Sequence, residues 1–262
     1  MKPALSDTPR ALSTATPSWW ARTLGACGQC EVCHTAPAPA ICTDCAARYR
    51  HTTPRCRTCA GGVAAGQVQC VACLRAGAAW PLDACLAAVP YGYPWQGLVQ
   101  QFKFRDQPQL AQPLADLLRQ TAGVVDLLGA ADWVLGMPLA PERLAQRGYN
   151  QAHELAKALS PRARVNTAAL LRTRATQAQS GLSRTQRLNN LANAFAVDPS
   201  RAPQLKGARL VLVDDVMSTG ATLVAAAAAL QLAGPAHIAA LVVARRDRFE
   251  GLSADEPIDD AN

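Results

Sequence analysis

The sequence has no long apolar run, and this absence narrows the class of protein. No apolar stretch approaches the roughly 20 residues that span a bilayer, so we expect no membrane insertion. Residues 1–20 are rich in Ser, Thr and Pro and have no continuous apolar core, which argues against a secretory signal. Half of the 262 residues are apolar and 17% are charged, a globular rather than a disordered balance. We therefore expect a cytoplasmic protein.

Two common nucleotide-binding patterns and a rich set of aromatic residues are also missing. The chain contains neither the P-loop pattern nor Gly-x-Gly-x-x-Gly, which disfavours nucleoside triphosphate and dinucleotide folds. Aromatic residues make up only 5% of the chain, too few to propose a stacking platform for bases.

Positive charge is present in excess and is concentrated in one segment. The formal net charge is +7. The segment from Pro141 to Asn190 has two Glu and nine basic residues, so it carries the equivalent of the whole excess: Arg143, Arg147, Lys157, Arg162, Arg164, Arg172, Arg174, Arg184 and Arg187. One interpretation is a solvated face. The other is a phosphate-rich partner, either a small polyphosphate or a nucleic-acid backbone.

Cysteine is abundant near the N-terminus, where eight of the ten cysteines form four Cys-x-x-Cys pairs. The pairs are Cys30/Cys33, Cys42/Cys45, Cys56/Cys59 and Cys70/Cys73, separated by eight, ten and ten residues. Two such knuckles complete a tetrahedral zinc site, so four predict two zinc ions. Redox chemistry is the alternative, and the near-regular repetition favours zinc. With four cysteines on each ion no coordination position stays open, so we expect a structural role.

The sequence does not determine which knuckles share a zinc ion. The simplest assignment is sequential, with one zinc on Cys30, Cys33, Cys42 and Cys45 and the other on Cys56, Cys59, Cys70 and Cys73, and an interleaved pairing is the alternative. Cys27 offers a second choice for the first knuckle, and His34 offers a substitute ligand. Cys85 has no partner at this spacing and is expected to be a core thiol. The segments between knuckles are small and turn-forming, so metal is expected to hold the module together.

Strands and helices alternate in the remaining two thirds of the chain. We expect strands within 132–138, 208–213 and 236–245, with a further strand as an option within 162–172, and helices over 110–118, 150–159 and 222–234. This alternation predicts an α/β fold with a parallel sheet flanked by helices. Ligands in such sheets bind at the carboxyl ends of the strands.

The stretch "RLVLVDDVMSTGATL" stands out, because a continuous apolar strand runs into two carboxylates and a loop of small and hydroxyl residues. Leu210 to Val213 are expected to form a central strand, with Asp214 and Asp215 at its carboxyl end. The loop of Ser218, Thr219, Gly220, Ala221 and Thr222 then leads into a helix. The plain alternative is an ordinary helix N-cap. A cap needs only one such residue, whereas this segment has two acids and three hydroxyl residues.

These residue types suit a ribose phosphate. Free N–H groups and the dipole at a helix N-terminus favour an anion, and Gly220 lets the backbone approach it closely. The two aspartates can accept hydrogen bonds from ribose hydroxyls, and Mg²⁺ can share the site.

The segment "VLVDDVMSTGAT" resembles the PRPP (phosphoribosyl pyrophosphate) motif of type I phosphoribosyltransferases. Together with the cysteine module and the segments "KFRDQPQLAQPLADLL", "MPLAPERLAQRGYNQAHELAKAL" and "LLRTRATQAQSGLSRTQRLNNLANAF", it makes the chain resemble the ComF family over about residues 30 to 246. In that family a zinc-ribbon region precedes a phosphoribosyltransferase-type domain. Its members are linked to uptake of single-stranded DNA in natural transformation.

The resemblance implies roles for particular residues. Asp214, Asp215 and Ser218 to Thr222 would hold the ribose 5-phosphate of PRPP with Mg²⁺, the two aspartates being the best catalytic candidates. A loop with Met137, Pro138, Leu139, Arg143 and Arg147 would contact pyrophosphate, and a hood with Arg172, Arg174, Gln179 and Arg187 would cover the site or contact DNA. Arg147 has two plain alternatives, an ion pair with Glu154 or a capping role in its own loop. Relatives often have Pro-Val-Pro-Leu where this chain has Gly136-Met137-Pro138-Leu139, which leaves that loop's conformation open.

We expect four segments: a disordered N-terminal segment (1–26), a double zinc ribbon (27–80), a phosphoribosyltransferase-like domain (81–248) and an acidic tail (249–262). Two functions compete. One is a Mg-dependent phosphoribosyltransferase, and the other is a PRPP- or nucleic-acid-binding scaffold or sensor that works with single-stranded DNA and DNA-uptake proteins. A zinc-stabilised interaction module with neither activity is a third hypothesis.

Overall fold

The computed structural model describes residues 28–160, 164–173 and 194–247. The expectations for the two terminal segments, for Cys27 and for the hood residues Arg174, Gln179 and Arg187 fall outside the described residues.

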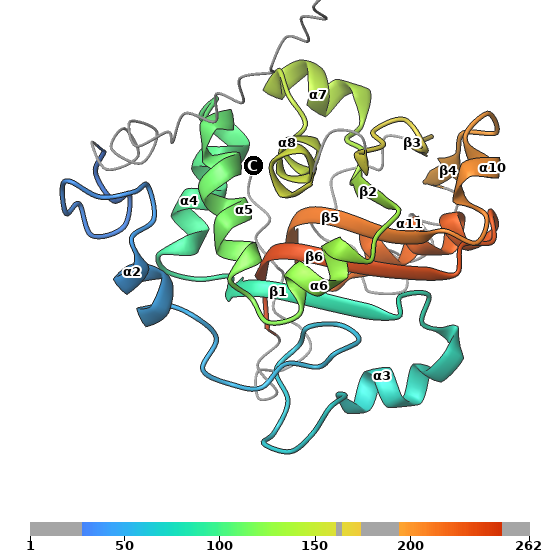
Figure 1. Ribbon diagram of the computed structural model, residues 1–262, viewed down its shortest axis with the longest axis horizontal. Coiled ribbons are helices and arrows are strands. Elements are labelled where there is room, and N and C mark those ends of the chain that lie inside the picture. The colour runs from blue at the N-terminus through green and yellow to red at the C-terminus, as the bar shows by residue number, and fades with distance from the viewer. Residues whose placement is uncertain (1–27, 161–163, 174–193, 248–262) are drawn as a thin grey trace, which may run out of the picture.

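Four parallel strands form the central sheet, in the order β1-β6-β5-β2 (Figure 1). They are β1 (Ala84–Pro90), β2 (Trp133–Gly136), β5 (Arg209–Met217) and β6 (His237–Arg245). The two middle strands contain the apolar runs Leu210–Val213 and Ile238–Ala244, because both faces of the sheet are covered there. The predicted parallel sheet is therefore confirmed, and β1 is a strand that the sequence analysis did not predict.

Helices on one face of the sheet pack against Val211 and Val213 of β5, within one core cluster. They are α4 (Trp95–Phe104), η2 (Pro108–Leu110), α5 (Ala111–Arg119), α6 (Val124–Gly129) and α8 (Gln151–Leu159). The predicted helices over 110–118 and 150–159 are confirmed, with Asn150 as the N-cap of α8: its side chain accepts hydrogen bonds from the N–H groups of Ala152 and His153. The exposed α7 (Pro141–Arg147) lies above this layer (Figure 1).

The opposite face is covered by α11 (Ala221–Gln231) and by a small antiparallel pair, β3 (Leu170–Arg172) and β4 (Phe195–Val197). Leu210 and Leu212 of β5 point to this side, as the two-residue period of a strand requires. Two short helices also belong to this part of the chain: α10 (Ala202–Leu205), whose Leu205 is buried in the same core cluster, and η1 (Gly77–Ala79), which precedes β1. The optional strand within residues 162–172 is confirmed as β3.

The cysteine-rich region precedes the sheet and contains two short helices, α2 (Thr43–Arg48) and α3 (Val71–Ala76) (Figure 1). Within the described residues, no helix is both long enough and apolar enough to cross a membrane.

Candidate functional site

Asp214 and Asp215 lie within β5, which runs four residues further than the expected end at Val213. The strand continues because β6 is equally long and pairs with it as far as Met217. β2 on the other side stops where Gly136 faces Val213. The acid pair, Asp214 and Asp215, therefore emerges just beyond the carboxyl end of β2, where a parallel sheet binds ligands.

Asp215 is buried and forms an ion pair with a lysine on a different element. Its Oδ1 lies 3.1 Å from Nζ of Lys103, in the last turn of α4. The sequence analysis did not identify Lys103 as a site residue. The one available signal was its place in "KFRDQPQL", next to the buried Phe102, where a solvated helix end is the plainer interpretation.

The surroundings of Asp214 disfavour its charged form. Burial, with a further contribution from the charge of Asp215, raises the pKa of Asp214 to about 7. Lys103 and Arg172 act in the opposite direction, and the Asp214 Oδ1 accepts a hydrogen bond from the backbone N–H of Asp215 at 2.9 Å. A cation bound beside the pair would favour the ionised form of Asp214.

Arg147 is placed against the acid pair by an aromatic contact. Its guanidinium stacks over the ring of Phe104 at 4.7 Å. Burial lowers the pKa of Arg147, and the charge of Asp215 opposes that shift, so the two groups act on each other electrostatically. The alternative pairing with Glu154 is not among the ion pairs of the described residues, and the Glu154 carboxylate lies 2.8 Å from Lys157 instead.

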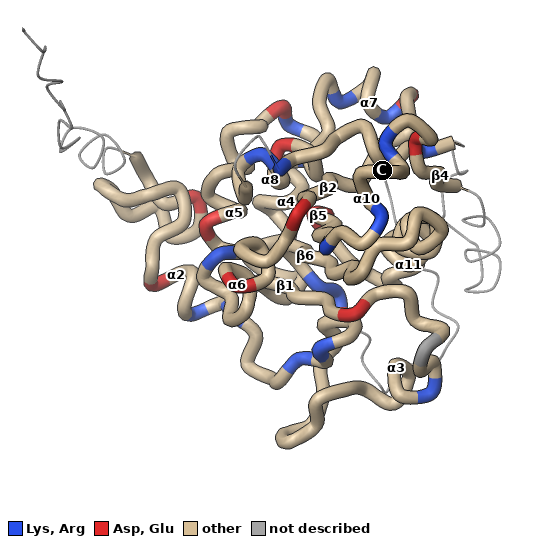
Figure 2. The backbone as a smooth tube through the Cα atoms, turned by 45° about the vertical axis from the view of Figure 1, so that its right-hand side comes forward, with Lys and Arg blue, Asp and Glu red and all other residues tan. Residues whose placement is uncertain are grey.

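Arg143 and Arg172, two more of the predicted arginines, also act electrostatically on the residues around the acid pair. Arg172, at the end of β3, lies over the ring of Phe195 at 5.6 Å. Burial lowers the pKa of Arg172 and the charge of Arg143 adds to the shift, whereas Asp214 opposes it. Arg143 also acts on Arg147. Basic positions gather around α7 (Figure 2), so positive charge from α4, α7 and β3 surrounds one acid pair.

The loop of residues 137–139 continues β2 and lies beside the acid pair. The N–H of Met137 bonds to the Val213 carbonyl at 2.9 Å, and its carbonyl accepts from the Asn150 side chain at 3.0 Å. The side chain of Met137 is buried, as is Pro138, and Leu139 is partly buried. A ligand at this position would therefore meet mainly backbone groups.

Gly136 explains why this chain departs from the Pro-Val-Pro-Leu of relatives. A Cβ at this position would lie 2.6 Å from the ring of His153 and 2.7 Å from the backbone of Ala152. Helix α8 therefore approaches β2 more closely than any side chain permits. His153 itself packs against Gly136, with its Nε2 buried.

The hydroxyl loop, Ser218 to Thr222, connects β5 to the start of α11. Gly220 caps the helix with φ at +80°, a conformation that favours glycine. A Cβ there would lie 2.4 Å from the terminal methyl of Met217. Thr219 Oγ1 accepts from the N–H of Ala221 at 3.3 Å. The first turn of α11 has N–H groups without intrahelical partners and the positive end of the helix dipole, both suited to an anion.

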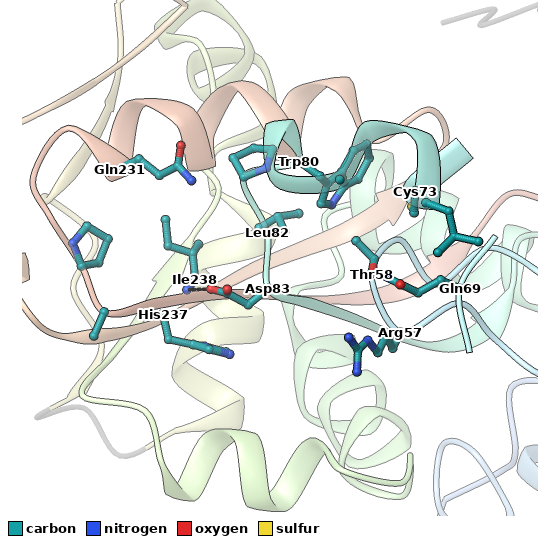
Figure 3. Close-up of a pocket in the computed structure, with 15 residues that line it drawn as sticks. Arg57, Thr58, Gln69, Cys73, Trp80, Leu82, Asp83, Gln231, His237 and Ile238 are labelled. Carbon is teal, nitrogen blue, oxygen red and sulfur yellow. Dashed lines mark hydrogen bonds between the residues drawn. The ribbon is translucent and has the colours of Figure 1, made fainter. Parts of the chain in front are cut away.

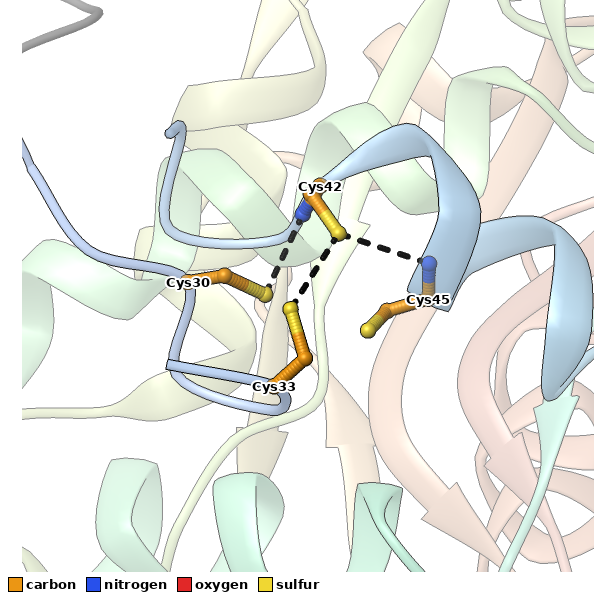
Figure 4. Close-up of side chains that lie close together, drawn as sticks. All are labelled: Cys30, Cys33, Cys42 and Cys45. Atoms are coloured by element: carbon orange, nitrogen blue, oxygen red, sulfur yellow. Dashed lines mark hydrogen bonds between the residues drawn. The ribbon is translucent and has the colours of Figure 1, made fainter. Parts of the chain in front are cut away.

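The eight predicted cysteines form two clusters with the sequential pairing. The first cysteine group is Cys30, Cys33, Cys42 and Cys45, and the second cysteine group is Cys56, Cys59, Cys70 and Cys73; within each group all sulfurs lie within 4.8 Å of one another. Figure 4 shows the four thiols of the first group converging. Sγ atoms in two adjacent knuckles lie 3.7 Å apart in both groups, close to the edge of about 3.8 Å that a tetrahedron of Zn–S bonds requires. Among the described residues His34 joins neither group.

The two groups repeat the same local geometry. Cys42 and Cys70 each precede a six-residue helix, with ψ near 158° in both. Their N–H groups donate to Sγ of Cys30 at 3.4 Å and of Cys56 at 3.3 Å. Such hydrogen bonds favour the thiolate, the form that binds metal.

Hydrogen bonds lower the pKa of Cys30 and Cys33 in the first group and of Cys56 in the second. A hydrogen bond with the Thr35 side chain, 3.3 Å away, lowers the pKa of Cys33 to about 6. Burial pushes the pKa of Cys56 upward, but hydrogen bonds from backbone N–H groups outweigh it and the pKa falls to about 7.

A cleft of about 650 Å³ lies away from the acid pair, between the second cysteine group and the far end of α11 (Figure 3). Arg57 and Gln69 line one side, and Asp83, Gln231 and His237 line the other. The Asp83 carboxylate accepts from the N–H of Ile238 at 2.7 Å, so this acid is part of the sheet's edge. The sequence analysis did not predict this cleft.

Comparisons with known proteins agree with the motif. The model of the phosphoribosyl transferase domain matches residues 144–258. The "DNA utilization protein YhgH" of Escherichia coli (strain K12) is 30% identical over 223 residues, covering 82% of this chain and 94% of that protein. The "Competence protein F" of Haemophilus influenzae is 31% identical over 188 residues, covering 70% of this chain and 80% of that protein.

Among solved structures, the allosteric regulatory enzyme of purine biosynthesis is similar over 55% of this chain and 30% of that chain. Its sequence identity is 18% and the TM-score is 0.34, a likeness too low to support a functional conclusion.

Proposed function

Because the chain belongs to the ComF family, we propose that it binds PRPP with Mg²⁺ and acts in the uptake or processing of single-stranded DNA during natural transformation. The relatives named for DNA utilization and for competence support the second half of this proposal. We place the protein in the cytoplasm, where PRPP and incoming DNA would meet, with DNA-uptake proteins as partners.

The observation that carries the PRPP proposal is the acid pair surrounded by cations beside a helix N-terminus. PRPP presents two kinds of group, namely ribose hydroxyls and phosphates. Carboxylates accept hydrogen bonds from hydroxyls and bind Mg²⁺, whereas guanidinium and ammonium groups pair with phosphates. Asp214 and Asp215 supply the first chemistry, and Lys103, Arg147 and Arg172 supply the second.

We assign the parts of the ligand as follows. The hydroxyl loop holds the 5-phosphate at the start of α11, and the acid pair holds the ribose. Residues 137–139 and Arg143, Arg147 and Arg172 hold the pyrophosphate with Mg²⁺. If transfer occurs, this positive charge would stabilise the negative charge that develops on the departing pyrophosphate. Arg174, Gln179 and Arg187 are proposed as hood or DNA contacts from the sequence alone.

We also propose that each cysteine group holds one zinc ion. Four sulfurs at tetrahedral spacing are a ligand set typical of structural zinc. With all positions filled by cysteine, zinc would supply structural cross-links and no Lewis-acid chemistry.

A second candidate function is a non-catalytic PRPP or nucleic-acid scaffold or sensor. It is favoured by the position of the 650 Å³ cleft, which lies at the other end of α11 and away from the acid pair (Figure 3). A transferase needs its acceptor next to the ribose, whereas a sensor does not.

Titration calorimetry with PRPP and Mg²⁺ tests the site. Asp215→Asn removes the partner of Lys103 and should weaken binding by about tenfold or more, because hydrogen bonds to charged groups contribute about 1.5–3 kcal/mol. Asp198→Asn is the matched control, since the Asp198 carboxylate accepts hydrogen bonds from the N–H and hydroxyl of nearby Ser200. Equal affinity of the wild type and Asp215→Asn would contradict the assignment.

The same preparation separates the two candidates. It is incubated with PRPP, Mg²⁺ and either nucleobases or single-stranded DNA, and pyrophosphate is measured. Release that depends on one acceptor identifies a transferase and its substrate class. Binding without release under every condition identifies the scaffold.

A further inference from the structure

Arg245 links the second cysteine group to the hydroxyl loop. It is the last residue of β6 and is only 7% exposed. Its Nε donates to the Cys59 carbonyl at 3.0 Å, and its Nη1 donates to the Met217 carbonyl at 3.1 Å and also to the Ser218 carbonyl. One buried cation thus gathers backbone carbonyls from a metal-binding knuckle and from the start of the loop.

These bonds fix the direction of the loop's amides. In a trans peptide the C=O and the following N–H point in opposite directions. When Arg245 holds the carbonyls of Met217 and Ser218, the N–H groups of Ser218 and Thr219 are turned away from Arg245. Those N–H groups belong to the segment that we assign to the 5-phosphate, so Arg245 sets the donor geometry without being a ligand itself.

Side-chain packing forms a second link between the same two places. The Cys85 thiol contacts Met217 Sδ at 3.6 Å, and the Met217 methyl fills the space beneath Gly220. Cys56, Cys59 and Cys73 belong to the same buried cluster as Met217. The second cysteine group is therefore part of the core on which the hydroxyl loop rests.

The first cysteine group has no comparable route among the described contacts. Its buried cluster is small, with Cys30, Ala38 and Cys45 at its centre, and Val32 and Tyr49 join it to the core on the α4 face of the sheet. Its attachments lead to α4 and to the end of α5, on the opposite face of the sheet from α11: Trp95 donates to the Tyr49 carbonyl at 2.7 Å, and Arg50 donates to Gln120 at 2.7 Å.

We propose that the second cysteine group, and not the first, controls the hydroxyl loop, with Arg245 as the positioning residue between them. The loop keeps its binding geometry only while the Cys59 knuckle is closed. The coupling is mutual, because a ligand that binds better when the knuckle is closed must by the same factor favour the closed, metal-retaining knuckle. The ligand half of this inference rests on the proposed function; the loop half does not.

Hydrogen exchange of residues 214–224 without any ligand tests the loop half. Cys70→Ser and Cys42→Ser are matched, because each changes the helix-capping cysteine of one group. Amide exchange in the loop should rise by about tenfold or more in Cys70→Ser and stay at the wild-type rate in Cys42→Ser. Equal rates in the two variants, whether both raised or both unchanged, would overturn the proposal.

Arg245 variants keep the test valid if Cys70→Ser fails to fold. Arg245→Gln should speed loop exchange while both zinc ions remain bound, and Arg245→Lys, which keeps the charge, should recover part of the protection. Arg119→Gln serves as a control, since Arg119 pairs with Asp116 on α5. Unchanged loop exchange in a folded Arg245→Gln would contradict the role of Arg245.

Zinc release to a chromogenic chelator tests whether ligand binding in turn favours the closed knuckle. PRPP with Mg²⁺ should slow the release of one of the two zinc ions by about tenfold in the wild type and by much less in Arg245→Gln. Equal protection in both proteins would overturn the coupling. If calorimetry shows that the wild type binds no PRPP, the proposed function fails, and the ligand-free exchange results still decide the control of the loop.

Discussion

The two cysteine groups have the same local geometry and very different surroundings. In both, a cysteine caps a short helix, donates its N–H to an earlier thiol and lies 3.7 Å from a thiol of the preceding knuckle. The first group forms a small cluster that meets the core of the α4 face only through neighbours such as Val32 and Tyr49, whereas cysteines of the second group are themselves part of the core on the α11 face. Local sequence sets how a metal is held, but the consequence of losing it depends on what is packed behind the site.

The largest expected difference between the groups concerns stability. Cys45→Ser and Cys73→Ser change equivalent buried cysteines, which are 5% and 4% exposed. Each should remove about one zinc ion per chain. Cys73→Ser should lower the free energy of unfolding of the sheet by about 3 kcal/mol or more, because it opens the shared core. Cys45→Ser should cost about 1 kcal/mol or less, because the first group can unfold locally.

Urea unfolding followed by tryptophan fluorescence, with metal analysis of the same samples, measures both effects. Comparable losses of stability in the two variants would show that the surroundings do not matter.

A smaller difference in stability is expected from the side chains that fasten each cysteine group to the rest of the protein. Arg55 forms a bidentate ion pair with Asp247, at 2.6 and 2.7 Å, on the side of the second group. On the side of the first group, Arg50 binds the neutral Gln120 at the surface. Arg55→Gln should destabilise the protein by about 1–3 kcal/mol, because it leaves a partly buried carboxylate without its partner.

Arg50→Gln is the matched variant and should cost no more than about 0.5 kcal/mol. Thermal unfolding of the two purified variants gives the comparison. An effect of Arg50→Gln as large as that of Arg55→Gln would remove the distinction between the attachments.

The smallest expected effect is a pH dependence confined to the second group. Burial tends to raise the pKa of Asp247, but the hydrogen bonds and charge of Arg55 outweigh it and hold the pKa below its ordinary value. The unfolded chain therefore takes up this proton first as pH falls. The contribution is complete above the unfolded pKa of about 3.9 and is lost as pH falls through the lower, folded value.

Unfolding midpoints of the wild type and Asp247→Asn at pH 6 and pH 3 measure this contribution. The gap between the two proteins should narrow at the lower pH. A gap that widens as pH falls would mean that the sign, and hence the role of Arg55, is wrong.

The sequence predicts what is encoded within short segments. The sequential pairing of the knuckles, the helices over 110–118 and 150–159 and the apolar run of β5 all depend on neighbours in the chain, and each is confirmed. β5 was expected to end at Val213 because aspartates seldom continue a buried strand. It continues because β6, 28 positions further along the chain at Arg245, still pairs with Met217.

The parts that escaped prediction depend on contacts between distant segments. Lys103 follows an apolar helix face and resembles a solvated helix end until α4 is placed beside β5. Arg245 resembles the polar end of a last strand, but its partners are 28 and 186 residues away in the sequence. Neither residue has a local pattern that distinguishes a buried cation from an exposed one.

The order of the strands in the sheet has a consequence for the order of events on the ribosome. β1 pairs with β6, and the second cysteine group is fastened by Arg245 and Asp247. A chain that emerges N-terminus first exposes its knuckles and β1 long before these partners exist. The second group can therefore collect its metal early, but it reaches its final place only after residue 247 has been made. If the second group binds zinc as proposed, the nascent chain would hold its metal site before the last strand pairs with β1 and completes the sheet.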